Sequence, residues 1–248
     1  MAQVTIKLKN ISIIRGEKQV FSNLNWTANK KEHWFIMGNN GSGKTTLIEI
    51  IMGYLWPQKG TVEILENTYG KTYIPKIREK IGYLSSWLFK RIKPNVLVKD
   101  VIASGKDASI GVCRCVDKSL QIKVKEQMLF FGISEYENTP FGNLSSGEQL
   151  KVLFARTIVS SIDILILDEP FCQLDIGQRM KMYRFLKKLS KKTNCPQFIL
   201  VTHHIEDVID VFTHGLFLKD GKIAMHGRKQ DILKEENINK IFKIKDSH

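Results

Sequence analysis

Short apolar segments alternate with segments of helical spacing along most of the 248-residue chain. Helical spacing is clear in TTLIEIIMGYL, residues 45–55, and two further helices are expected to begin near Ser146 and Asp175. The segments that indicate strands are VTIKLKN, QVFSNLNW, HWFIMG, TVEIL, KIGYLSS, DILILDEP, QFILVTHH and GLFLKDG. Because strands that alternate with helices form a mostly parallel sheet covered on both faces, the pattern predicts an α/β fold.

The middle and the end of the chain depart from this alternation. Residues from about 94 to 143 are less regular and lean towards helix, so we interpret them as a helical lobe inserted into the core. The core then consists of residues 1–93 and 144–248 of a single domain that spans residues 1–248. The last segment, residues 227–248, is polar and is expected to be helical.

The segment GNNGSGKTT lies between the predicted strand HWFIM and the predicted helix TTLIEIIM. It fits the pattern G-x-x-x-x-G-K-[ST], in which glycines let the backbone wrap closely around a phosphate. Successive N–H groups and the positive end of the following helix then face the anion. Lys44 is placed to reach the β- and γ-phosphates, and Thr45 offers its hydroxyl to Mg²⁺.

The residues of this loop that are expected to contact the nucleotide are Gly38, Asn39, Asn40, Gly41, Ser42, Gly43, Lys44, Thr45 and Thr46. A glycine-rich turn with a purely structural role is the alternative, and the position between a strand and a helix argues against it. The chain is therefore expected to bind a nucleoside triphosphate.

An acidic pair follows a second apolar segment, DILILDEP, residues 163–170. We interpret Asp168 as a group that holds magnesium through its water shell. Its neighbour Glu169 is interpreted as the group that orients or deprotonates the attacking water. Ordinary turn chemistry also explains an acidic pair after a strand, but the phosphate loop favours the catalytic interpretation.

A pair of histidines follows a third apolar segment, QFILVTHH, residues 197–204. Nucleotides bind at the carboxyl edge of open α/β sheets, so one imidazole is expected to arrive there. A neutral or protonated histidine can hydrogen-bond a γ-phosphate oxygen there and respond to its departure. A helix cap or a surface position is the more frequent role of such a pair, but its spacing from DILILDEP favours a catalytic His203.

The chain is basic, with 38 Lys and Arg against 25 Asp and Glu and a formal net charge of +13. Basic residues are dense from Lys71 to Lys93 and along RMKMYRFLKKLSKK, residues 179–192. This balance favours polyanionic partners: nucleotide, nucleic acid or an acidic membrane surface. For the second patch, whose charges lie along a predicted helix, a set of solvated lysines is an equally good explanation.

The cysteines and the lengths of the apolar runs indicate the cellular compartment. Cys113, Cys115, Cys172 and Cys195 are interpreted as reduced thiols, because the one close pair has no histidines spaced as further zinc ligands. No apolar run approaches the roughly 20 residues that cross a bilayer, and the N-terminus lacks the apolar core of a signal peptide. The chain is therefore expected to be soluble and cytoplasmic.

Five motifs occur in a familiar order, and these are GNNGSGKT, LSSGE, LILDEP, CQLD and VTHH. The set resembles the nucleotide-binding domain of ABC ATPases, over nearly all 248 residues. This resemblance implies a P-loop fold of ABC type, with an antiparallel β region and the inserted helical lobe. It also implies that the chain binds ATP and Mg²⁺ and hydrolyses the ATP.

The resemblance further implies that two chains pack head to tail around two Mg-ATP molecules. In that family the segment that matches LSSGE closes over the γ-phosphate held by the partner. Ser145, Ser146 and Gly147 are therefore expected to face the partner's ATP, with the positive end of the following helix. Leu174 and Asp175 match a loop at the same dimer seam.

A narrower resemblance concerns VIASGKDASIGV and VTHHIEDVIDVFTHGLFLKDGKIAMHG. These segments resemble stand-alone bacterial ABC ATPases that are named molybdenum-transport-like or photorepair-like.

Three positions depart from the family pattern. Ser86 stands where most members have a glutamine that contacts Mg²⁺, so either a water bridges from Ser86 to the metal or coupling follows another route. Glu148 brings a negative charge to the LSSGE motif and is expected to point away from the nucleotide. Arg15 occupies the position of an aromatic that stacks on adenine, where it either stacks through its guanidinium plane or serves as a turn residue.

Two functions follow from this resemblance. The leading hypothesis is the energising subunit of a membrane transporter, held by a separate permease at the inner face of the cell membrane. The alternative is a soluble ABC ATPase that acts on nucleic acid, on ribosomes or in regulation. The net charge of +13, Ser86 and the stand-alone resemblance favour the alternative, whereas the single nucleotide domain argues against a ribosomal role.

Overall fold

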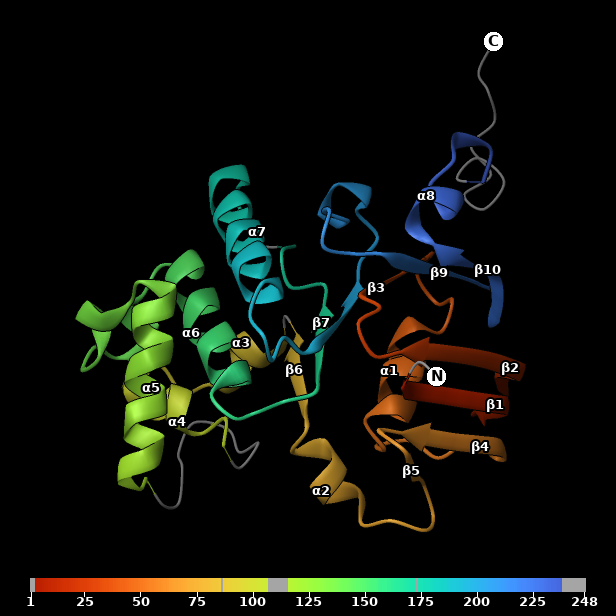
Figure 1. Cartoon of the computed structure of the whole chain (residues 1–248), viewed down its shortest axis with the longest axis horizontal. Helices are drawn as coiled ribbons and strands as arrows, with labels where there is room; N and C mark the ends of the chain where they lie inside the picture. Colours follow the sequence, from red (N-terminus) through yellow and green to blue (C-terminus); the bar gives the residue numbers. More distant parts are fainter. Residues whose placement is uncertain (1–2, 86, 107–115, 173, 238–248) are drawn as a thin grey trace. The chain divides into compact units, whose positions relative to one another are not determined.

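The computed structural model describes residues 3–85, 87–106, 116–172 and 174–237. The chain divides into two compact units, the first made of residues 1–78 and 197–248 and the second of residues 79–196 (Figure 1). Ser86, Cys113 and Cys115 lie outside the described residues, so the roles expected for them stay predictions. The expected division into a core and an inserted lobe has other bounds and also stays a prediction.

An antiparallel sheet with the strand order β2-β1-β4-β5 makes up one part of the first unit. Its strands are β1 (Val4–Arg15), β2 (Lys18–Asn29), β4 (Lys59–Ile64) and β5 (Asn67–Thr68). Along β1 the buried apolar positions change from even (Ile6, Leu8) to odd (Ile11, Ile13), and the register against β2 shifts between Leu8 and Ile11. The irregularity therefore keeps the apolar residues on one face across the shift.

The strands that carry the phosphate loop belong to a second sheet. In the first unit its strands, in the order β10-β9-β3-β8, are β3 (Trp34–Gly38), β8 (Gln197–Val201), β9 (His214–Lys219) and β10 (Lys222–Arg228). β3 runs parallel to β8 and to β9, while β10 is antiparallel to β9. Every residue of β3 and β8 is buried, as is typical of parallel strands covered on both faces.

The helices of the first unit are short. They are α1 (Lys44–Ile51), α2 (Ile74–Arg78), α8 (Lys229–Ile232) and the 3-10 turn η3 (Ile205–Asp207). Within the described ranges of the whole chain, no helix combines the length and the apolar character that a bilayer span requires.

Strand β10 corrects the expectation that the chain is helical from residue 227 onwards. β10 continues to Arg228, and α8 begins only at Lys229. The turn before β10 contains Asp220 and Gly221, with φ of 49° and 71°. Positive φ at both central positions is what a type I′ hairpin requires, and Asp-Gly is one of its preferred pairs. The turn was thus readable from the sequence, although β10 itself is exposed and half-buried in alternation.

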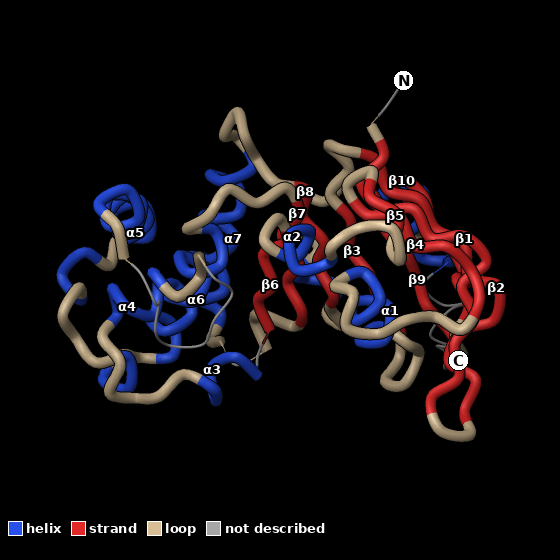
Figure 2. The backbone as a smooth tube through the Cα atoms, turned by 90° about the horizontal axis from the view of Figure 1, so that it is seen from below, coloured by secondary structure: helices blue, strands red, loops and turns tan. Residues whose placement is uncertain are grey.

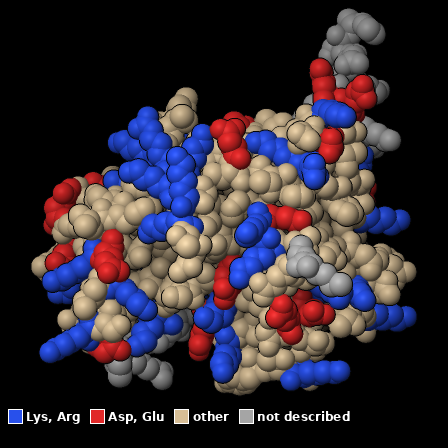
Figure 3. Space-filling model, viewed as in Figure 1, with Lys and Arg blue, Asp and Glu red and all other residues tan. Residues whose placement is uncertain are grey.

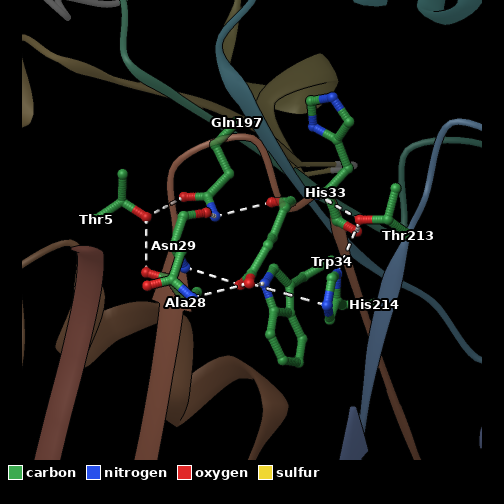
Figure 4. A network of polar contacts seen from close by, with 9 residues as sticks. Thr5, Ala28, Asn29, His33, Trp34, Gln197, Thr213 and His214 are labelled. Carbon is green, nitrogen blue, oxygen red and sulfur yellow. Dashed lines mark hydrogen bonds and ion pairs between the residues drawn. The ribbon is translucent and has the colours of Figure 1, made fainter. Parts of the chain in front are cut away.

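A buried glutamine joins the two sheets of the first unit (Figure 4). Gln197 is 3% exposed, and its Nε2 donates to the main-chain oxygens of Asn29 at 2.9 Å and Glu32 at 2.8 Å. Its Oε1 lies 2.6 Å from the hydroxyl of Thr5 on β1. The Glu32 carboxylate extends the network by accepting from Trp34 Nε1 at 3.2 Å. Because all these groups are satisfied by one another, the network fixes β8 against the antiparallel sheet.

His33, just before β3, is expected to make stability depend on pH. Its Nδ1 accepts a hydrogen bond from the Phe198 N–H at 3.0 Å, so the folded state needs this nitrogen unprotonated. Burial lowers the pKa of His33 from its ordinary value of 6.5. Below that value the unfolded chain binds more protons than the folded one, so stability is lost as the pH falls through 6.5 and below.

Thermal unfolding followed between about pH 5.5 and pH 7.5 should therefore show a lower midpoint at the acid end. The matched variant is His33→Asn, whose side-chain oxygen accepts the same bond without titrating. This variant should lose part of the pH dependence, and an unchanged dependence would show that other groups cause it.

The second unit combines two parallel strands with a group of helices. The strands are β6 (Ile81–Ser85) and β7 (Ile164–Asp168). The helices are α3 (Trp87–Arg91), α4 (Val98–Ala103), α5 (Lys118–Phe131), α6 (Ser146–Ile158) and α7 (Ile176–Ser190), with 3-10 turns η1 (Ser134–Tyr136) and η2 (Phe141–Asn143). Figure 2 shows α4, α5 and α6 side by side. The helices expected near Ser146 and Asp175 are confirmed as α6 and α7, and the parallel strands flanked by helices confirm the α/β class.

Candidate nucleotide-binding site

The loop between β3 and α1 depends on glycines at crowded or strained positions. Gly43 precedes α1 with φ 108°, and a Cβ on it would lie 2.6 Å from the Phe21 ring. A Cβ on Gly38 would overlap the main-chain oxygen of Leu218 on β9. Gly41 also has a positive φ, 77°, but open space surrounds it. Close packing therefore requires glycine at positions 38 and 43, whereas at position 41 only the backbone conformation does.

Lys44 turns its amine into this loop. Its Nζ donates to the main-chain oxygens of Gly38 at 2.7 Å and Asn39 at 3.1 Å, and the residue is 8% exposed. Nearby in the sequence, the hydroxyl oxygen of Ser42 is buried and has no hydrogen-bond partner within the described part of the chain. A buried cation and an orphaned hydroxyl in a glycine-rich loop fit an anion such as a phosphate group.

Helix α1 also lacks the N-terminal cap that the longer helices have. It has neither a side-chain cap nor an acidic residue in its first turn. By contrast, α5, α6 and α7 are capped by their own side chains, which are Asp117, Ser145 and Asp175. The first N–H groups of a helix require a partner. The N-terminus of α1 can therefore offer its N–H groups to the same kind of anion that Lys44 and Ser42 fit.

His203 follows the strand that lies next to the phosphate loop. Because β3 and β8 pair in parallel, both strands end at the same edge of the sheet. The turn after β8 is braced by the buried hydroxyl of Thr202, which donates to Asp207 Oδ2 at 2.7 Å. The His203 ring is exposed and lies against that of His204, with 4.0 Å between the centroids. An imidazole is thus presented at the edge where the phosphate loop begins.

Arg15, at the end of β1, forms an ion pair with Glu49 on α1. Its Nη1 lies 2.9 Å from Glu49 Oε2, and the two side chains are 59% and 30% exposed. An ion pair this exposed contributes little to stability. It does place the guanidinium beside the helix that begins at the phosphate loop. Stacking of Arg15 on adenine stays a prediction.

In the second unit, β7 delivers Asp168 and Glu169. The Tyr83 hydroxyl, on the neighbouring strand β6, donates to Asp168 Oδ2 at 3.0 Å and so orients that carboxylate. Glu169 has φ 48°, in the left-handed region that costs a residue with a side chain about 1–2 kcal/mol. Strain of this kind is concentrated at functional sites. The hydrogen bond from Tyr83 and the strained backbone of Glu169 therefore indicate that the end of β7 is a functional site.

The LSSGE segment begins α6, and Glu148 folds back onto its start. Glu148 Oε2 accepts from the Ser145 N–H at 2.8 Å, and Glu148 Oε1 accepts from the Tyr136 hydroxyl at 2.7 Å. These bonds, with that from Tyr136 as the largest cause, lower the pKa of the Glu148 carboxyl. The negative charge of Glu148 therefore stays at the N-terminus of α6, whose positive end is expected to act on the partner's ATP.

The glycine of the same segment packs against α7. A Cβ on Gly147 would lie 2.9 Å from Gln178 Cδ. The N–H of Gln178 donates to Asp175 Oδ1 at 2.8 Å, which caps α7. Ser145 and Ser146 are exposed beside them. The two segments that the family resemblance places at one dimer seam thus meet within the second unit.

Three residues of these contacts were not identified from the sequence. They are Tyr83, Tyr136 and Gln178. The capping box itself was readable, because Ser145 and Glu148 have the required spacing. The tyrosines gave no local signal, since their partners are 85 and 12 residues away.

The magnesium site stays a prediction, and so does a catalytic site that combines residues of both units. Within the part of the chain that the structure describes, no group of three or more His, Cys, Asp or Glu is placed to hold a metal. Mg²⁺ usually keeps several waters and binds substrate phosphates with one or two carboxylates, which is compatible with Thr45 and Asp168 as ligands. Thr45 and His203 belong to the first unit, whereas Asp168 and Glu169 belong to the second.

Comparison with known proteins identifies the same family, ABC transporters, over most of the chain. The family model for ABC transporters matches residues 21–172, which include the phosphate loop, LSSGE and the acidic pair. An ABC transporter ATP-binding protein of Streptococcus mutans is 33% identical over 237 residues, covering 96% of this chain and 91% of that protein. The ABC transporter ATP-binding protein ModF of Escherichia coli is 35% identical over 222 residues, covering 87% of this chain and 45% of ModF.

A solved structure shows the same fold. The dimeric ATP-binding cassette MJ0796, in a post-hydrolysis state bound to ADP and Pi, superposes with a TM-score of 0.74 and is 25% identical. The match covers 90% of this chain and 98% of that chain. By its motifs, its fold and these matches, this chain belongs to the ABC transporter family of ATP-binding proteins.

Proposed function

We propose that this chain is the ATP-hydrolysing subunit of a membrane transporter whose permease is a separate protein. As a member of the ABC family, the chain is a nucleotide-binding ATPase. The start of α1 carries the nucleotide-binding part of the proposal, because an uncapped helix, the buried amine of Lys44 and the orphaned hydroxyl of Ser42 meet in one loop. The transport part is supported by the relatives, which are named ABC transporter ATP-binding proteins. The permease would hold the chain at the membrane.

The proposed chemistry is mainly positioning and charge neutralisation, because phosphoryl transfer needs little covalent help. Lys44 exchanges the loop oxygens for the β- and γ-phosphates of ATP. Thr45 and Asp168 would hold Mg²⁺, which would supply positive charge to neutralise the phosphates. Glu169 orients or deprotonates the attacking water, and His203 hydrogen-bonds the γ-phosphate.

ATP is proposed to join two copies of the chain head to tail. Ser145 and Ser146 are exposed at the start of α6, and Ile176 is 83% exposed at the start of α7. The contact of Gly147 with Gln178 brings these two helix starts together. The phosphate loop of a second copy is proposed to cover these two helix starts, with Ile176 in the interface.

Dimerisation is tested by the ATPase rate per chain, which should rise with protein concentration and then level off. Ile176→Asp should move this rise to about tenfold higher concentration, the effect of a loss of roughly 1.4 kcal/mol at the interface. The control is Ile122→Asp, which places the same charge on α5 at a residue that is 59% exposed. A rate per chain that is independent of concentration would refute the dimer.

Transport is tested by capture from detergent-treated membranes. The Glu169→Gln chain, saturated with ATP, should retain an integral membrane protein. The control Lys44→Ala, which cannot hold the phosphates, should release it. Capture of nucleic acid or ribosomes in place of a membrane protein would favour the soluble alternative. The basic residues of α7 support that alternative.

A further inference from the structure

The solvent-facing side of α7 carries a long run of positive charge. Residues 176–192 contain seven basic and no acidic side chains, and the basic ones are Arg179, Lys181, Arg184, Lys187, Lys188, Lys191 and Lys192. Figure 3 shows Lys and Arg atoms gathered where α7 lies in Figure 1. The second basic patch of the sequence is therefore concentrated on one element of the second unit.

The opposite side of α7 faces the core. The buried residues of this helix are Met182, Tyr183, Leu186 and Leu189. On the exposed side, Lys181, Arg184 and Lys188 of the helix and its C-cap residue Lys191 follow at spacings of three or four residues, which places them in one stripe. The helix of 15 residues is about 22 Å long at 1.5 Å per residue. The stripe is thus a nearly straight row of charges on a rigid support.

This row repels itself. Arg184 lies four residues before Lys188, and Lys181 and Lys188 each lie three residues before the next member of the stripe; like charges at such spacings face each other on a helix. Among the described residues, no acidic side chain pairs with the four members of the stripe. A partner with regularly spaced negative charges would remove the repulsion.

We propose that this stripe binds the phosphate backbone of a nucleic acid duplex without reading its sequence. A duplex presents negative charges at regular and close intervals along its axis, and Lys and Arg bind them with release of counterions. Five of the seven basic residues are lysines, which protein–protein interfaces contain less often than the remaining surface does. The stripe therefore fits phosphates better than it fits an acidic protein.

Two other polyanions fit less well. A single strand is bound by stacking its bases on aromatic rings, but Tyr183 is buried, and Phe185 lies against Phe130 and Phe131 of α5 at 6.0 and 4.9 Å between centroids. An interfacial membrane helix inserts its apolar face into the bilayer. The apolar face of α7 is already buried in the second unit, so α7 has no such face to insert.

The test is the salt dependence of binding to a fluorescent 24-base-pair duplex, of DNA and of RNA, measured by anisotropy with the full chain. If four phosphates are contacted, affinity should fall about 100-fold between 50 and 200 mM salt. The variant Lys181→Gln/Arg184→Gln/Lys188→Gln/Lys191→Gln should reduce the logarithmic salt slope by about one for each side chain removed.

The matched control removes the same charge from exposed lysines of the first unit, in Lys9→Gln/Lys18→Gln/Lys59→Gln/Lys222→Gln. This control should keep the slope, and circular dichroism should show that both variants are folded. The proposal is overturned if neither duplex binds, or if the control variant loses as much of the salt slope as the α7 variant does. It is also overturned if only phosphatidylserine vesicles, and no duplex, bind through α7. The experiment needs neither ATP nor a permease, so its outcome is independent of the transport proposal.

Discussion

Glu169→Gln is expected to bind ATP with nearly normal affinity and to hydrolyse it about 1,000-fold more slowly, within the range contributed by a general base. The amide keeps the shape of the carboxylate and loses its ability to accept a proton. Because the dimer would separate only after hydrolysis, the variant should accumulate as an ATP-bound dimer. Size-exclusion chromatography with Mg-ATP, together with phosphate release, measures both effects.

The chain offers a close control for this variant. Glu66 also has a left-handed backbone, with φ 65°, and it lies in the turn between β4 and β5. Glu66→Gln makes the same chemical change under the same backbone strain, at a site with no proposed role. This variant should keep full turnover and stay monomeric after ATP is consumed. If Glu169→Gln retained full activity, the assignment of the base would be wrong.

Gly43→Ala is expected to lower the affinity for ATP by about 100-fold, which corresponds to roughly 2.7 kcal/mol. The added Cβ would lie 2.6 Å from the Phe21 ring while φ is 108°, so the turn into α1 has to move. A shift of this turn misaligns Lys44 and the first N–H groups of the helix together. Isothermal titration with ATP measures the loss, and a melting curve shows how much stability falls with it.

Two comparisons separate crowding from backbone strain. Gly41→Ala introduces a methyl group at φ 77° with nothing within 4 Å, so it should cost only the strain and reduce affinity less. The double variant Gly43→Ala/Phe21→Leu makes room for the new methyl group and should recover part of the lost affinity. Equal affinities of Gly43→Ala and the unmodified chain would show that the loop tolerates displacement.

The strands and the loop of the site were predictable because their signals are local. β3, β7 and β8 are short apolar runs bounded by glycine or by polar residues, and a buried parallel strand needs no more than that. The phosphate loop combines a strand end, its glycines and a helix start within nine residues, 38–46. Strand β10 was missed because its apolar face, with Ile223 and Met225, is short and only half-buried, so its hairpin turn was the clearer signal.

The amino-acid sequence alone determined the family, the phosphate loop and the position of the acidic pair, since each is recognised from residues that are close together in the sequence. Only the tertiary structure decided which side chains hold these groups: Tyr83 on Asp168, Tyr136 on Glu148 and Gln178 against Gly147. It also decided that the lysines of α7 form one stripe, because the sequence shows their number but not which side of the helix the core covers. Such contacts join residues of different elements and depend on how these elements pack, which the pattern of a single segment does not show.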